Sequence, residues 1–159
     1  MNFNEKNKKL KTYITLLDDI GQKDFLMPIE EIRLGNQFAE LKDPELLKSA
    51  LLVDKYLDHK NFHVKRVIAI AFRSLEIFDD AKINQAMGRF LSDSAHWVVH
   101  DAIWYFKNAK TTDKQIIETI KDLSVKTPLT DEQLAETPPS SDPTVNMKWM
   151  ADKTLGILK

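Results

Sequence analysis

The four histidines of the chain have the spacing of a metal site. They form two pairs, His59 with His63 and His96 with His100. Residues four apart lie on the same face of a helix, so either pair could offer two imidazoles to zinc or iron. No glutamate follows either pair in the arrangement of a metalloprotease. Capping or solvent-facing histidines are therefore the favoured interpretation, and we expect no metal or other cofactor. A metal-dependent enzyme built on the two pairs is the alternative.

The other residue patterns that perform catalysis are missing or have a structural explanation. The sequence has no cysteine, no Gly-x-Ser-x-Gly and no glycine-rich phosphate loop. Its paired carboxylates, Asp18-Asp19 and Asp79-Asp80, fall at the expected ends of helices, where capping and solvation explain acidic side chains. The sequence predicts a protein that is not an enzyme.

The composition favours a helical domain of ordinary size. The 159 residues are 43% hydrophobic and include only four glycines, which favours helix over a turn-rich β fold. The formal net charge of −1 does not require a polyanionic partner. The sequence has neither the apolar core of a signal peptide nor an apolar run of membrane-spanning length. We expect a single, monomeric, cytoplasmic all-α domain with no membrane partner.

Apolar residues at three- and four-residue spacing, with Pro and Asp at helix starts, divide the chain into helices. Pro28, Asp43-Pro44 and Asp142-Pro143 are the clearest start signals. They predict about seven or eight helices, over residues 4–20, from 28, 43–57, 63–78, 80–91, 96–107, from 111, and 142–158. In this division residues 1–41 are N-terminal capping helices, 43–125 the repeat core, 126–141 an insert and 142–158 the C-terminal helix.

The insert is acidic and rich in proline. From residue 127 to 147 there is no Lys or Arg, and four of the six prolines fall there. Such a composition is typical of a loop, in which Thr130 and Gln133 could cap one short helical turn. A plain solvated loop is the favoured interpretation. The alternatives are that the insert docks a basic partner or folds over the binding face.

An internal repeat appears at an offset of 34 residues, which aligns Leu57 with Leu91, Val64 with Val98 and Phe72 with Phe106. The segments that carry it are Leu57-Asp58 with Val64-Lys65, Leu91-Ser92-Asp93 with Val98, and Ser141-Asp142-Pro143-Thr144-Val145 with Trp149. They resemble HEAT repeats, whose pattern is a Leu, a turn Asp, and a Val-Arg that opens a second helix. Lys65, Val99 and Asn146 stand where that pattern has Arg. The resemblance covers residues 43–159 and implies a right-handed stack of antiparallel helical hairpins, the HEAT-like α-α superhelix.

A stripe of aromatic and polar residues follows the second helix of each repeat. In a HEAT-like stack the second helices line the concave surface, so we predict that this stripe binds a partner. Tryptophan and arginine dominate binding hot spots because they combine buried area with directed polar contacts. The competing interpretation is that both tryptophans of the stripe pack between hairpins. The predicted partner-binding residues are His63, Arg66, Ile70, Arg73, Trp97, His100, Asp101 and Trp104. Trp149 is assigned to the core because it aligns with Ala102.

These features favour a non-catalytic, protein-binding helical-repeat module. An immunity protein that neutralises a toxin, or an adaptor, would suit the size and class. The alternative is a nucleic-acid-binding protein similar in architecture to the DNA alkylation repair glycosylases, although those proteins are usually more basic. The third hypothesis is the metal-dependent enzyme described above.

Overall fold

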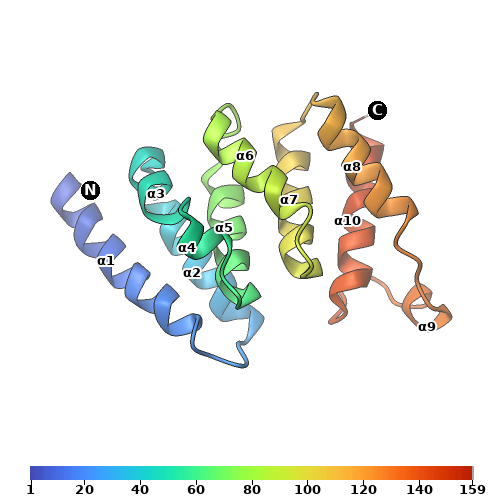
Figure 1. The fold of residues 1–159 in the computed structure, drawn as a ribbon, viewed down its shortest axis with the longest axis horizontal. Helices are drawn as coiled ribbons and strands as arrows, with labels where there is room; N and C mark the ends of the chain where they lie inside the picture. The colour runs from blue at the N-terminus through green and yellow to red at the C-terminus, as the bar shows by residue number, and fades with distance from the viewer. Residues whose placement is uncertain (159) are drawn as a thin grey trace. The chain divides into compact units, whose positions relative to one another are not determined.

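The computed structural model describes residues 1–158, whose regular secondary structure is all helical, with ten helices and no strand in that range (Figure 1). Their bounds are α1 Phe3–Ile20, α2 Pro28–Glu40, α3 Pro44–Leu51, α4 Asp54–Leu57, α5 Phe62–Leu75, α6 Ala81–Phe90, α7 His96–Ala109, α8 Lys114–Val125, α9 Asp131–Leu134 and α10 Pro143–Ile157. The all-α prediction is confirmed. The predicted number of helices was too low, because two short helices, α4 and α9, were not counted separately. No helix in residues 1–158 is long and apolar enough to cross a membrane.

The chain forms two compact units, and the boundary between them along the sequence falls within α6. The first unit, residues 1–86, contains α1 to α5 and the start of α6. The second, from residue 87 onward, contains the rest of α6 and α7 to α10.

Polar side chains start the helices of the first unit where the sequence predicted. The carboxylate of Asp43 accepts a hydrogen bond from the Leu46 backbone N–H at 3.1 Å, and Pro44 takes the first helical position of α3. The carboxylate of Asp80 does the same for α6, accepting from the backbone of Lys82 at 3.0 Å and Ile83 at 3.1 Å. These acidic residues are therefore capping groups.

The predicted helix over residues 43–57 is wrong in its middle. α3 ends at Leu51, and Val53 has extended backbone with φ −124° and ψ 151°. The Val53 carbonyl then accepts hydrogen bonds from the Tyr56 and Leu57 backbone N–H groups, both at 3.0 Å, which starts α4. β-Branched valine fits this extended position well. The break leaves Leu51, Leu52 and Tyr56 all buried.

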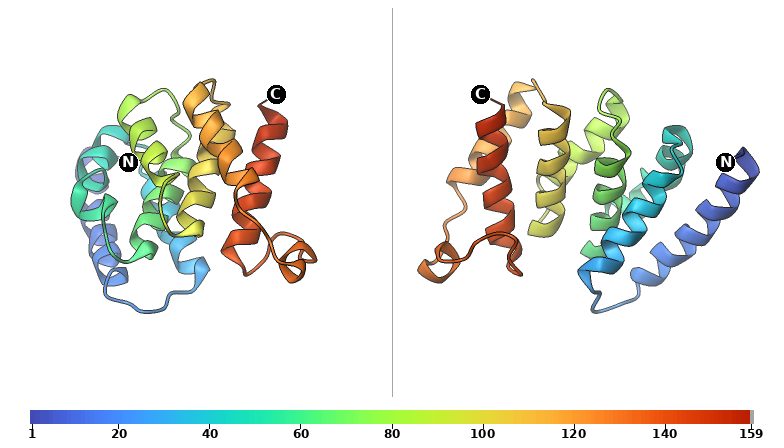
Figure 2. Two further views of the ribbon diagram at one scale, coloured as in Figure 1. Left: turned by 45° about the vertical axis from the view of Figure 1, so that its right-hand side comes forward. Right: turned by 180° about the vertical axis from the view of Figure 1, so that it is seen from behind.

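The core of the first unit lies between α2 and α5. These two helices pack along each other and lie side by side in Figures 1 and 2. The backbones approach closely at Gly35. A Cβ atom placed there would lie 2.5 Å from Cγ2 of Ile70 and 3.1 Å from the Val67 carbonyl oxygen. Glycine is therefore required at position 35 by packing, and α2 continues beyond it to Glu40.

α10 packs against both α7 and α8 in the second unit (Figure 2). Asp142 starts α10 as predicted, accepting a hydrogen bond from the Thr144 backbone N–H at 2.8 Å. The predicted capping box also forms. The Thr130 hydroxyl accepts from the Gln133 backbone at 3.2 Å, and the Gln133 side chain accepts from the Thr130 backbone at 2.9 Å, which makes the short helix α9.

The assignment of Trp149 to the core is wrong. Its side chain is exposed, and the amine of Lys153 lies 4.6 Å from the ring centroid. α10 buries Val145, Met147 and Met150 instead, so its buried face is not the one that the alignment with Ala102 indicated.

The 34-residue repeat found in the sequence is also a repeat of helix bounds. α5 and α7 have 14 residues each; they begin at Phe62 and His96 and end at Leu75 and Ala109. Each helix is followed by a residue in the left-handed conformation, Glu76 with φ 60° and Lys110 with φ 50°. Residues of α5 and α7 that are 34 apart in the sequence therefore occupy the same position along their helices.

Candidate functional site

Two tryptophans and a histidine form a ladder of rings along α7. The ring of His100 lies between Trp97, with centroids 5.5 Å apart at 86°, and Trp104, with centroids 5.9 Å apart at 79°. Both contacts are edge-to-face, which is the favourable arrangement of aromatic pairs. We call these three residues the α7 ladder. The spacing i, i+3, i+7 places them on one face of the helix.

The α7 ladder is built around a buried centre. His100 is 8% exposed, whereas the two tryptophans that flank it are only partly buried. Its neighbour Asp101 is 1% exposed, and the Asp101 Oδ1 atom lies 3.6 Å from Nδ1 of His100. The histidine ring is thus fixed in place, and each tryptophan keeps part of its surface accessible.

Lys107 lies beside the outer end of the α7 ladder. Its amine is 5.4 Å from the centroid of the Trp104 ring, within the range of a cation–π contact. The accessible surface at this end is therefore both aromatic and basic.

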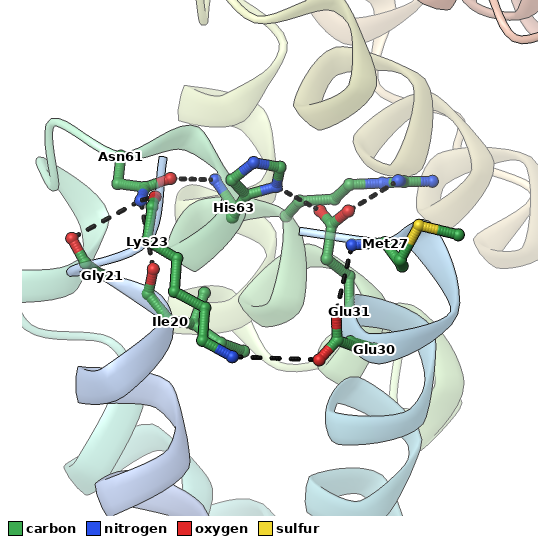
Figure 3. A network of polar contacts seen from close by, with 9 residues as sticks. Ile20, Gly21, Lys23, Met27, Glu30, Glu31, Asn61 and His63 are labelled. Carbon is green, nitrogen blue, oxygen red and sulfur yellow. Dashed lines mark hydrogen bonds and ion pairs between the residues drawn. The ribbon is translucent and has the colours of Figure 1, made fainter. Parts of the chain in front are cut away.

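The corresponding positions of α5 form a different structure. Arg66 and His63 meet a carboxylate from the neighbouring helix α2 (Figure 3). The guanidinium Nη1 of Arg66 donates to Oε1 of Glu31 at 3.2 Å, and Nδ1 of His63 lies 3.4 Å from Oε2 of the same side chain. We call Glu31, His63 and Arg66 the buried cluster, because their exposed fractions are 1%, 8% and 5%.

Neighbouring contacts hold the buried cluster in position. Asn61 caps α5 by accepting from the His63 backbone N–H at 3.0 Å, and its amide donates to the Ile20 and Lys23 carbonyls that follow α1 (Figure 3). At the start of α2, Glu30 accepts from the Met27 backbone N–H at 3.1 Å, and its carboxylate lies 3.9 Å from the amine of Lys23 (Figure 3). Asn61 therefore joins the start of α5 to the end of α1, and an ion pair joins the residues after α1 to the start of α2.

Burial dominates the electrostatics of Glu31. Removal from water raises the pKa of its carboxyl group above the usual value, and the nearby charges of Arg66 and His63 only partly offset that effect. The cluster is a polar contact inside the fold, and the carboxylate has almost no surface through which to reach a ligand.

Five of the eight predicted binding residues are therefore buried inside the protein: His63, Arg66, Ile70, His100 and Asp101. Ile70 has no exposed surface and packs at Gly35, so it is a core residue and its assignment to a binding surface is wrong. His63 and Arg66 are engaged with Glu31, and Arg73 is partly buried. On α7 the surface that a partner could reach belongs to Trp97 and Trp104, because Asp101 and His100 lie beneath it.

Sequence reasoning missed Glu31, although a signal was present. Glu31 shares one face of α2 with Leu34, Gly35 and Phe38, all buried, at spacings of three, four and seven residues. A carboxylate on the apolar face of a helix needs a buried partner. A search for a basic residue on a neighbouring apolar helix would have found Arg66.

The histidine pairs do not come together as metal ligands. His59 accepts a hydrogen bond at Nδ1 from the Asn61 backbone at 2.9 Å, and Nδ1 of His96 lies 2.8 Å from the Thr144 hydroxyl. Within residues 1–158 no three His, Asp or Glu side chains are grouped to hold a metal ion. His59 and His96, the first member of each pair, therefore each use Nδ1 in a hydrogen bond within the fold.

The chain was compared with protein-family models, with curated proteins and with solved structures, and none of the three comparisons gave a match.

Proposed function

We propose that the chain is a non-catalytic helical module that binds another protein through the α7 ladder. The single observation that carries this proposal is the partial exposure of Trp97 and Trp104 on either side of the buried His100 ring. The resemblance of residues 43–159 to HEAT repeats is consistent with the proposal, because proteins of that kind generally bind other proteins.

The physical argument is one of preorganisation. A tryptophan that is already held in one orientation loses little side-chain freedom when a partner covers it. It can bury a large aromatic area against that partner. Two such residues, two turns apart on one helix, supply the central anchors that protein interfaces use.

Nucleic-acid binding is the second candidate, favoured by the position of Lys107. A base could stack on the Trp104 ring while the amine of Lys107 contacts a phosphate. The net charge of −1 argues against a large electrostatic contribution. Protein binding is therefore the preferred function.

A pair of variants tests the proposal. The double variant Trp97→Ala, Trp104→Ala removes the accessible rings, and Trp149→Ala is a matched control because Trp149 is also an exposed tryptophan beside a lysine amine. Each chain is used to capture partners from nuclease-treated extract of the source cells. Captured proteins are then purified and their dissociation constants measured by titration.

We expect a purified partner to bind the wild type and Trp149→Ala equally, and to bind the double variant at least about tenfold more weakly. Equal binding by all three chains would remove the α7 ladder as the binding surface. Circular dichroism of each variant checks that the helices remain. Capture from untreated extract that is lost in the nuclease-treated extract would favour the nucleic-acid alternative.

A further inference from the structure

Two segments of the chain, one basic and one acidic, each carry an excess of one charge. Of the 23 Lys and Arg residues, four lie in residues 1–11, beside one glutamate. Of the 24 Asp and Glu residues, four lie in residues 127–147, which contain no Lys or Arg. The 19 basic and 19 acidic side chains that remain cancel. Residues 59–75 are a third uneven segment, with four basic residues and no acidic one, but Arg66 there is buried and paired with Glu31. The exposed candidates for a charged contact are therefore residues 1–11 and 127–147.

The basic segment lies on the outer face of α1. Lys8, Lys9 and Lys11 are exposed, and within residues 1–158 none of their amines forms an ion pair. The hydroxyls of Thr12 and Thr15 on this side are satisfied by the helix itself, because they donate to the Lys8 and Lys11 carbonyls at 3.3 and 3.1 Å. The amines of Lys8, Lys9 and Lys11 are thus the groups on this face that an acidic partner could pair with.

The acidic segment surrounds α9, and its accessible carboxylates are those of Asp131 and Glu132. Both side chains are exposed, and neither has an ion pair in the described part of the chain. The other two carboxylates are engaged locally. Glu136 accepts a hydrogen bond from the Ser140 hydroxyl, and Asp142 accepts from the side chain of Gln133 at 2.9 Å.

The helix that bears each set of charges, α1 or α9, also carries an apolar side chain that its own unit leaves uncovered. On α1, Leu16 is 44% exposed, and on α9, Leu134 is 63% exposed. A contact between the two segments would bury apolar surface as well as pair opposite charges, so it would not depend on solvated ion pairs alone.

We propose that the outer face of α1 docks the acidic segment around α9 of a second copy of this chain. The occupant is chosen by charge complementarity, because one molecule carries both members of the pair. Such a contact joins two different surfaces, so it is heterologous and adds copies into rings or short chains. Few charges take part and they are accessible to salt, so the association is weak, with the chain monomeric at low micromolar concentration.

Sedimentation velocity over a range of concentrations tests this contact. At about 50 mM salt, where charges interact over roughly 14 Å, we expect the average mass to rise above the monomer value of 18.4 kDa near about 200 µM protein. At about 500 mM salt the mass should return to that of the monomer. A monomer at low salt and high concentration would overturn the proposal, and so would association that salt leaves unchanged.

Charge reversal identifies the surfaces. Lys8→Glu with Lys11→Glu makes the α1 face acidic, and Asp131→Lys with Glu132→Lys makes the α9 segment basic. Each variant alone should associate at least about tenfold more weakly than the wild type. A one-to-one mixture of the two variants should regain association, because the reversed face of one meets the reversed segment of the other.

A control variant separates this contact from a general effect of net charge. Lys82→Glu with Lys114→Glu makes the same change in net charge at two exposed residues in the first turns of α6 and α8, where glutamate is favourable. It should associate like the wild type. If this control weakens association as much as the α1 variant, or if the mixture stays monomeric, the contact between α1 and the α9 segment is wrong.

Discussion

The buried cluster on α5 and the α7 ladder occupy equivalent positions of two helices of equal length. The positions on α5 are buried in the core, whereas the tryptophans on α7 are partly exposed. Arg66 and His100 are related by the 34-residue offset, and so are Ile70 and Trp104. On α5, a carboxylate from α2 neutralises the basic residue, and Gly35 lets the backbone close over Ile70. On α7, the equivalent of Ile70 is a tryptophan that keeps part of its surface accessible.

This difference shows that the neighbouring helix decides whether a position is core or surface. α2 brings a glycine and a glutamate to α5, and together they fit its isoleucine and arginine. The repeat in the sequence fixes which residues are equivalent, whereas the facing helix fixes what they do. Four predictions test this explanation, from the largest expected effect to the smallest.

The first prediction concerns the arginine of the buried cluster. Arg66→Leu leaves the carboxylate of Glu31 buried without its guanidinium partner, so we expect the free energy of unfolding to fall by about 3–5 kcal/mol. Urea denaturation at neutral pH measures the change. Arg33→Leu, at an exposed position of α2, is the control and should change stability by less than about 0.5 kcal/mol. Similar small effects for both variants would mean that the cluster does not hold α2 against α5.

The second prediction compares equivalent positions directly. Ile70→Ala removes a fully buried side chain and should reduce the free energy of unfolding by about 2–5 kcal/mol. Trp104→Ala removes a larger but partly exposed side chain and should cost only about 1–2 kcal/mol. Both values come from urea denaturation. If Trp104→Ala proves as damaging as Ile70→Ala, the tryptophan is a core residue and the proposed binding surface loses its main anchor.

The sequence could predict features that one helix determines by itself, but not those that depend on a neighbouring helix. Capping residues such as Asp43, Asp80 and Asp142 act on their own helix, so local patterns located them correctly. The break before α4 and the burial of Ile70 depend on tertiary packing, which periodicity alone does not contain.

The candidate site was predictable only where one helix determined it. The α7 ladder comes from the spacing of Trp97, His100 and Trp104 within α7. The buried cluster needs Glu31, 35 residues before its partner Arg66, and no repeat or motif connects the two. The same limit explains Trp149, because an alignment assigns a residue to a face without knowing which face the neighbouring helices cover.

The third prediction tests the close approach at Gly35. In Gly35→Ala the new methyl group would meet Ile70 and the Val67 carbonyl, so we expect a loss of about 1–3 kcal/mol despite the better helix propensity of alanine. Gly156→Ala is the matched control. It also lies in a helix, but no atom lies within 4 Å of the added Cβ, so it should gain about 0.5–1 kcal/mol. Thermal and urea unfolding should rank the two variants in opposite directions from the wild type, and a stabilising Gly35→Ala would contradict the packing described.

The fourth and smallest effect is the pH dependence contributed by Glu31. Burial raises the pKa of its carboxyl group in the folded protein, so the folded state binds this proton more tightly than the unfolded state does. The contribution of Glu31 to stability is therefore complete below the unfolded pKa, near 4.5, and is lost as the pH rises through the higher folded pKa. Glu31→Gln removes this titration. We expect the free energy of unfolding of the wild type to fall relative to Glu31→Gln as the pH rises from about 4 to 7. Urea denaturation of both chains across that range measures the difference. A wild type that gains stability relative to the variant over the same range would show that Arg66 and His63 outweigh burial, and that the buried cluster resembles a strong ion pair more than a carboxylate enclosed by the core.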